Sequence, residues 1–284
     1  MKKKLAVIAL AGMMAAGFTT GNVQAAEPGG ELYVFIAASL ANAMEEIQKD
    51  FNEKYPDVEI FYNADSSGTL QKQIEEGSRC DIFFSAATKQ MDALVEEKLA
   101  KEDSVKDLLE NKVVLIKLKD FETKVTGFEN ITEAENLALA GEDVPVGQYA
   151  REIFTNLGIM DQVENMEINE GKNVTEVLAA ITQGSNEVGV VYATDAASVA
   201  DQVEIIAEAP AEALETPVLY PVGLTEDQEA SSAEQEAAEV FLEYLQTEEA
   251  LTVFEEYGFS PYTEEKEAAA AEENIENTEE KAAE

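Results

Sequence analysis

Residues 34–44 have the sequence Val34-Phe35-Ile36-Ala37-Ala38-Ser39-Leu40-Ala41-Asn42-Ala43-Met44, and this stretch decides the fold. Its first residues are apolar strand formers, and Leu40 and Met44 then begin a helical spacing that continues to Phe51. The pattern predicts a strand that runs directly into a helix, with Ser39 at the N-cap. The first turn of a helix offers free N–H groups and a positive dipole end, which suit an anion. Most N-cap serines only cap a helix, so this stretch alone does not predict a binding site.

The same pattern recurs along the chain. A strand at 58–62 leads to Ser66-Ser67 and a second helical pattern, and a buried strand at 81–86 precedes a third. Strands that alternate with helices are typical of a parallel sheet with helices on its faces. The sequence therefore predicts an α/β fold.

Two stretches are suited to cross between domains, the strand at 113–118 and the extended segment at 217–222. Two crossings would make the second domain an insertion into the first. We therefore predict that domain I comprises residues 27–112 and 223–262. Domain II, with both crossing strands, comprises residues 113–222. The last helices then return to domain I.

The two ends of the chain differ from the rest. Residues 1–26 carry three lysines, an apolar stretch and then small residues, which predicts a signal peptide cleaved near Ala25 or Ala26. We expect an exported protein at the periplasmic or extracellular face of the cytoplasmic membrane. No cysteine lies at the end of the apolar stretch, so a lipid-modified N-terminal cysteine is not expected. Residues 263–284 are rich in Glu and Ala and are predicted to form an acidic disordered tail.

Composition excludes several classes of function. The chain has no His and a single cysteine, Cys80, so it has no His-based triad, no zinc–cysteine site and no internal disulfide. Its formal net charge of −40, from 19 basic and 59 acidic residues, repels nucleic acid and anionic membranes. Local donors can still bind an anion, because screening at physiological ionic strength acts over about 8 Å.

Several strand ends and helix starts carry hydroxyl groups or free N–H groups. These are Ser39, Ser66-Ser67, Val144-Pro145-Val146-Gly147, Asn173-Val174 and Tyr192. Ligands of open α/β sheets bind beyond the carboxyl ends of strands, so two facing domains would bring these groups to one cleft. No Arg or Lys occurs in these motifs, and neutral donors suit an anion that has no proton to donate.

The same motifs, in this order and spacing, resemble the molybdate-binding proteins of ABC importers. The resemblance runs from residue 31 to about residue 262. The stretches that carry it are Ala37-Ala38-Ser39-Leu40, Ser66-Ser67-Gly68-Thr69-Leu70, Asp81-Ile82-Phe83-Phe84-Ser85-Ala86, Val144-Pro145-Val146-Gly147, Gly189-Val190-Val191-Tyr192 and Tyr257-Gly258-Phe259. The resemblance implies a two-domain type II periplasmic-binding-protein fold, each domain a mainly parallel sheet flanked by helices. It also implies a binding protein rather than an enzyme, with no cofactor.

The resemblance further implies the ligand and its residues. Molybdate or tungstate would bind in the interdomain cleft, and molybdenum would be present only as this oxyanion. The hydroxyls of Ser39 and Ser67, the backbone N–H groups of Val146 and Val174 and the Tyr192 hydroxyl would donate to it. Whether Ser66 or Ser67 is the ligand stays open. The implied partner is the permease of an ABC importer, and a monomer is expected.

Other functions are weaker alternatives. Sulfate has the charge and shape of molybdate, and phosphate needs an acceptor that only Asp65, beside Ser66, would supply. An enzyme is disfavoured because the serines lie in no nucleophile motif and Gly-x-Ser-x-Gly is absent. An acidic cation-binding module is disfavoured because the acidic residues form no calcium loop.

Overall fold

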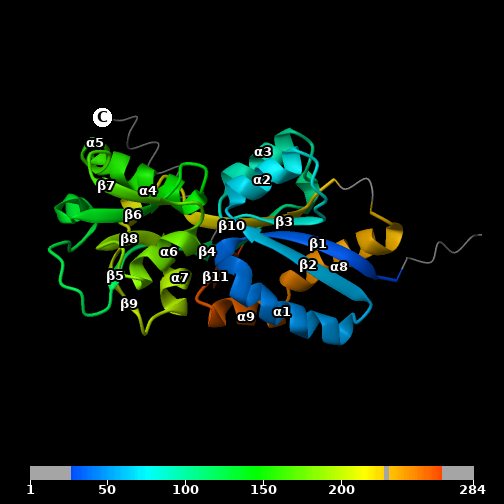
Figure 1. Ribbon diagram of the computed structural model, residues 1–284. Helices are drawn as coiled ribbons and strands as arrows, with labels where there is room; N and C mark the ends of the chain where they lie inside the picture. The colour runs from blue at the N-terminus through cyan, green and yellow to red at the C-terminus, as the bar shows by residue number, and fades with distance from the viewer. Residues whose placement is uncertain (1–26, 227–229, 264–284) are drawn as a thin grey trace, which may run out of the picture.

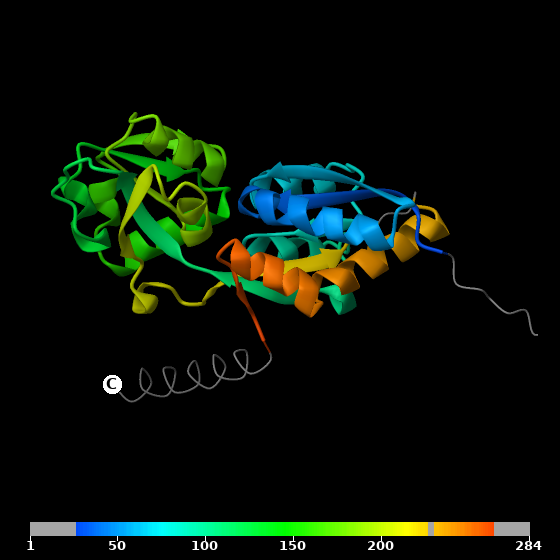
Figure 2. The same ribbon diagram turned by 90° about the horizontal axis from the view of Figure 1, so that it is seen from below.

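The computed structural model describes residues 27–226 and 230–263, and it contains two β-sheets (Figure 1). The expected signal peptide, and the expected acidic tail from residue 264 on, lie outside the described residues. We call each sheet, with the helices that pack on it, a lobe. Figure 2 shows the two lobes side by side, joined by extended segments.

The first lobe is built on a six-stranded sheet in the order β11-β4-β10-β3-β1-β2. Strand β1 pairs in parallel with β2 and β3, whereas β10 runs antiparallel to β3 and β4. The strands are β1 (Gly30–Ala37), β2 (Val58–Asp65), β3 (Ile82–Phe84), β4 (Lys106–Asn111), β10 (Val218–Leu224) and β11 (Ser260–Pro261).

Helices cover both faces of this sheet. One face carries α2 and α3, and the other carries α1, α8 and α9, so the last two helices return to the first lobe as expected (Figure 1). The helices are α1 (Ala41–Lys54), α2 (Ser67–Glu75), α3 (Thr88–Glu96), α8 (Ser232–Leu245) and α9 (Glu248–Glu256). Apolar residues at helical spacing explain the packing, since Met44, Ile47 and Phe51 of α1 are fully buried.

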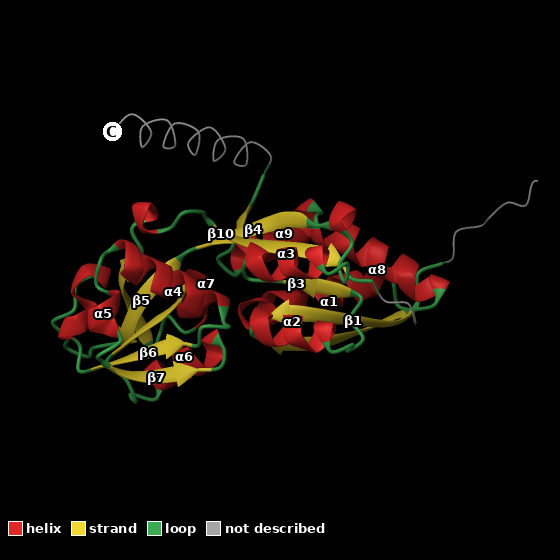
Figure 3. Cartoon of the chain, turned by 90° about the horizontal axis from the view of Figure 1, so that it is seen from above, coloured by secondary structure: helices red, strands yellow, loops and turns green. Residues whose placement is uncertain are grey.

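The second lobe repeats this design with a five-stranded sheet in the order β7-β6-β8-β5-β9. Strand β6 pairs in parallel with β7 and β8, and β5 runs antiparallel to β8 and β9. Helices α4 and α5 lie on one face, and α6 and α7 lie on the other (Figure 3). The elements are β5 (Val113–Leu118), β6 (Asn136–Ala140), β7 (Glu167–Gly171), β8 (Val188–Tyr192), β9 (Val203–Glu208), α4 (Pro145–Asn156), α5 (Met160–Val163), α6 (Val174–Thr182) and α7 (Ala193–Ser198).

The chain crosses between the lobes at two places. At the first, β4 and β5 lie in different sheets and only Lys112 separates them. At the second, β10 pairs with β3 and β4, so residues 218–222 lie in the first sheet and not in the inserted domain that the sequence predicts. The sequence pattern marks this segment as extended, but it does not say which sheet supplies the hydrogen-bond partners.

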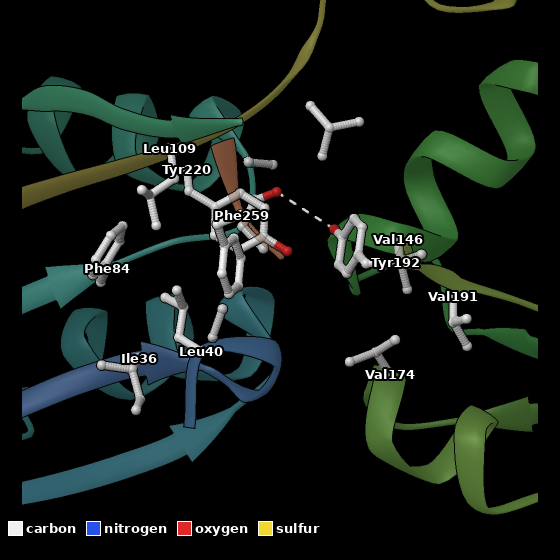
Figure 4. Packing of buried hydrophobic residues seen from close by; sticks show 14 of the residues in the cluster. Ile36, Leu40, Phe84, Leu109, Val146, Val174, Val191, Tyr192, Tyr220 and Phe259 are labelled. Atoms are coloured by element: carbon white, nitrogen blue, oxygen red, sulfur yellow. Dashed lines mark hydrogen bonds between the residues drawn. The ribbon is translucent and has the colours of Figure 1, made fainter. Parts of the chain in front are cut away.

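Short helical turns complete the described chain. These are the 3-10 turns η1 (Ala38–Leu40), η2 (Glu102–Ser104), η3 (Phe128–Glu133) and η4 (Ala211–Ala213). One buried apolar cluster runs through both lobes, with Leu40 and Phe84 on one side and Val146 and Tyr192 on the other (Figure 4). In the described part of the chain, no helix is both long enough and apolar enough to cross a membrane.

Candidate functional site

A pocket lies between the two lobes, and all five residues expected to bind a ligand line it. The first lobe contributes Ala37, Ala38, Ser39, Asp65, Ser66, Ser67 and Ala86. The second lobe contributes Val144, Pro145, Val146, Asn173, Val174 and Tyr192. The lining residues lie at the carboxyl ends of β1, β2 and β8, in the turn η1, shortly after β3 and in the first turns of α2, α4 and α6. This is the position at which α/β sheets bind ligands.

Ser39 is not the N-cap that its sequence position predicted. It lies inside the 3-10 turn η1, and the N-cap of α1 is Leu40, which has no side-chain cap. The extra turn after β1 moves the serine away from the capping position. Its Oγ instead lies 3.0 Å from the hydroxyl of Tyr220 in β10.

The structure distinguishes Ser66 from Ser67. Ser66 is the N-cap of α2, where its Oγ accepts from the Thr69 backbone N–H at 3.2 Å and donates to the Thr69 hydroxyl at 2.8 Å. Its proton is therefore already engaged. Ser67 is fully buried, and its Oγ accepts from the Ala86 backbone N–H at 2.9 Å. This bond leaves the Ser67 proton free to be donated to a ligand.

Helices α4 and α6 point their first turns at the pocket. In α4, Pro145 occupies the first turn. The first hydrogen bond within this helix is the one that the Gln148 N–H donates to the Val144 carbonyl. In α6, the Asn173 side chain caps the helix by accepting from the Glu176 N–H at 3.0 Å. The N–H groups of Val146 and Val174 lie before these bonds, where a helix has no partner of its own to offer.

Tyr192 ends β8 and is 2% exposed. Burial raises its pKa well above the ordinary value, so the hydroxyl keeps its proton. The hydroxyl donates to the Ala86 carbonyl of the first lobe at 3.4 Å, near the long limit for such a bond. A better acceptor placed in the pocket would compete for this proton.

The electrostatics of the pocket depend on backbone dipoles and hydroxyl groups. None of its lining residues is Lys or Arg, and Asp65 is its one carboxylate. Asp65 Oδ1 accepts from the Ser66 N–H at 2.8 Å and from Asn173 Nδ2 at 3.0 Å, so the carboxylate links the two lobes. Local sequence pattern cannot predict this link, because the two residues are 108 positions apart.

Further contacts join the lobes beside the pocket. Lys72 of α2 forms an ion pair with Asp143, and Gln90 Nε2 of α3 donates to Gln148 Oε1 of α4 at 3.2 Å. Gly68 of α2 packs so closely on the Asp143 carbonyl that a Cβ at Gly68 would lie 1.9 Å from this oxygen. The lobes therefore meet in direct contact around the pocket.

Comparison with known proteins gives consistent matches. A family model described as "bacterial extracellular solute-binding protein" matches residues 32–260. A putative ABC transporter substrate-binding lipoprotein, YvgL, of Bacillus subtilis is 41% identical over 231 residues, which are 81% of this chain and 86% of the relative. The molybdate-binding protein ModA of Haemophilus influenzae is 36% identical over 233 residues, 80% of this chain and 89% of the relative.

A solved structure gives the same result. The substrate-binding domain of a putative molybdenum ABC transporter from Clostridium difficile matches with a TM-score of 0.62 and 35% sequence identity. The match covers 82% of this chain and 99% of that domain. The expected two-domain fold of periplasmic binding proteins is confirmed by this similarity and by the two sheets.

Proposed function

Since the chain belongs to the family of bacterial extracellular solute-binding proteins, we propose that it binds molybdate between its lobes and delivers it to the permease of an ABC importer. The family consists of binding proteins and not of enzymes. Molybdate is named as the ligand of the relative from Haemophilus influenzae, which is 36% identical to this chain. An extracytoplasmic location follows from the family.

One observation carries the choice of an oxyanion. Uncharged donors from both lobes face one pocket whose lining contains no Lys or Arg. In this proposal the donors are the hydroxyls of Ser39, Ser67 and Tyr192 and the N–H groups of Val146 and Val174. A hydrogen bond to a charged group contributes about 1.5–3 kcal/mol, so five such bonds give roughly 8–15 kcal/mol before desolvation and closure costs.

The arrangement also favours a ligand without a proton. Molybdate, tungstate and sulfate are dianions that only accept hydrogen bonds, and we propose that tungstate binds as molybdate does. Monohydrogen phosphate needs an acceptor for its proton. Asp65 is the one carboxylate in the lining, and its Oδ1 already accepts two hydrogen bonds. Phosphate is therefore the weaker candidate.

The donors come from both lobes, so we propose that the ligand draws the lobes together. In this view residues 113 to about 216 form the inserted domain, with β4 and β10 left in the first domain. We further propose that residues 1–26 are removed on export near Ala25 or Ala26, and that the mature protein acts as a monomer.

Calorimetry with molybdate, tungstate, sulfate and phosphate tests this function. We expect one-to-one binding of molybdate and tungstate in the micromolar to nanomolar range, which corresponds to about 8–12 kcal/mol. Tight binding of sulfate or phosphate, with no heat from molybdate, would assign the pocket to another oxyanion. No binding of any of the four would refute the proposed ligand class.

A further inference from the structure

We propose that Tyr220, oriented by Asn111, is a positioning residue that makes the Ser39 hydroxyl a hydrogen-bond donor toward the bound oxyanion. The inference rests on the proposed function, because it concerns how one donor of that site is oriented. Neither Tyr220 nor Asn111 lines the pocket, so both would act through Ser39.

Tyr220 is held rigidly at the second crossing between the lobes. It lies in β10, is fully buried, and its hydroxyl is 3.0 Å from Ser39 Oγ. Its ring packs edge-on against Tyr192, with centroids 5.6 Å apart, and against Phe259, with centroids 5.3 Å apart (Figure 4). These contacts fix the ring, so its hydroxyl stays beside Ser39.

Asn111 determines which way the hydrogen bonds run. The Lys112 backbone N–H donates to Asn111 Oδ1 at 2.8 Å, which fixes the orientation of the amide because an N–H must meet the oxygen. Asn111 Nδ2 then faces the other way. It donates to the Tyr220 hydroxyl at 3.1 Å and to Thr194 Oγ1 of the second lobe at 2.9 Å.

The contact between Tyr220 and Ser39 fits either hydroxyl as the donor, and we assign the donor to Tyr220 because its oxygen already accepts from Asn111. The Tyr220 oxygen accepts from Asn111, and its own proton has Ser39 Oγ as an acceptor at 3.0 Å. Burial raises the pKa of Tyr220 well above its ordinary value, so this proton is not lost at physiological pH. In the proposed direction, Ser39 accepts a hydrogen bond from Tyr220, and its own proton is left for the pocket that it lines.

The chemical consequence is selectivity. A serine hydroxyl without Tyr220 is free to rotate and to turn a lone pair toward the ligand, which repels an anion. With Tyr220 in place, the hydroxyl offers its proton to a ligand that only accepts. The network also reaches both crossings, since Asn111 ends β4 and Tyr220 lies in β10.

A double-mutant cycle on the full chain tests the proposal. We would measure molybdate affinity by calorimetry for the parent protein, Tyr220→Phe, Ser39→Ala and the double variant. We expect Tyr220→Phe to weaken binding about 5- to 20-fold when Ser39 is present and less than 2-fold in the Ser39→Ala background. Tyr62→Phe is the matched control. The Tyr62 hydroxyl donates to the Met44 carbonyl at 3.0 Å, and Tyr62 does not line the pocket.

Each outcome separates the two proposals. If the parent protein does not bind molybdate, the proposed function fails. If the parent protein binds and Tyr220→Phe binds equally well, Tyr220 does not position Ser39. An equal loss in both backgrounds would assign Tyr220 a purely structural role and overturn the inference. Melting temperatures of all variants show whether each is folded, and Asn111→Ala offers a second way to release the Tyr220 hydroxyl.

Discussion

Gly68→Ala should weaken ligand binding about 100-fold while leaving the protein with separated lobes as stable as before. A Cβ at Gly68 would lie 1.9 Å from the Asp143 carbonyl oxygen of the other lobe, whereas ordinary contact begins at 3.4 Å. The two lobes must therefore separate by about 1.5 Å, the difference between these distances. A hydrogen bond of about 2.9 Å stretched by that amount is no longer a hydrogen bond.

The expected loss follows from the donors of the second lobe. Three proposed donors lie there, at Val146, Val174 and Tyr192, and each bond to a charged acceptor contributes about 1.5–3 kcal/mol. Losing one or two of these hydrogen bonds reduces the binding free energy by about 3 kcal/mol, which raises Kd about 100-fold. Once the lobes are apart, the substitution does not destabilise α2, since Ala is favoured over Gly in helices by up to about 1 kcal/mol.

Calorimetry and thermal unfolding measure both effects in the same sample. Gly29→Ala is the matched control, because its added Cβ would meet its nearest neighbour at 3.4 Å, away from the other lobe. An unchanged Kd for a folded Gly68→Ala variant would refute the idea that contact between the lobes is part of binding.

Three further predictions concern other charges of the molecule. Asn173→Ser keeps a helix cap but loses the donor to Asp65, so it should weaken ligand binding several-fold, whereas Asp65→Asn, which still accepts, should not. Burial raises the pKa of Asp195 to about 7. Between about pH 4 and pH 7 this carboxyl therefore holds a proton in the folded state and has lost it in the unfolded state. The free energy of unfolding should then fall as pH rises through this window, by up to about 1.4 kcal/mol per unit, and urea titrations should show this slope reduced in Asp195→Asn. Stopped-flow association of molybdate should speed up with added salt, because salt screens the net charge of −40; slower association would contradict this.

The sequence predicted the parts of the site that depend on local pattern. A strand followed by a hydroxyl residue and a helical stripe places Ser39 and Ser67 at strand ends, and the fold then brings them together. The contact between Tyr220 and Ser39 could not be predicted from the sequence. The two residues are 181 positions apart, and the pattern around Tyr220 indicates only an extended segment. The N-cap expected at Ser39 was wrong for a related reason: a 3-10 turn and a direct helix start look alike in the spacing of apolar residues.

A strongly acidic protein can bind a dianion when the hydroxyl groups of its pocket already accept hydrogen bonds from the protein and so offer their protons to the ligand. Ser67 Oγ is occupied by the Ala86 N–H, and Ser39 Oγ by Tyr220 in the proposed direction. With one lone pair of each oxygen engaged in this way, the proposed arrangement directs both hydroxyl protons to the pocket. The net charge acts through a screened medium, whereas these donors act at contact distance, so the local groups decide the sign of the interaction. A pocket of this polarity rejects ligands that must donate a proton and accepts those that only receive one. In this proposal the hydrogen-bond network selects ligands by protonation state, and the pocket walls select them by size.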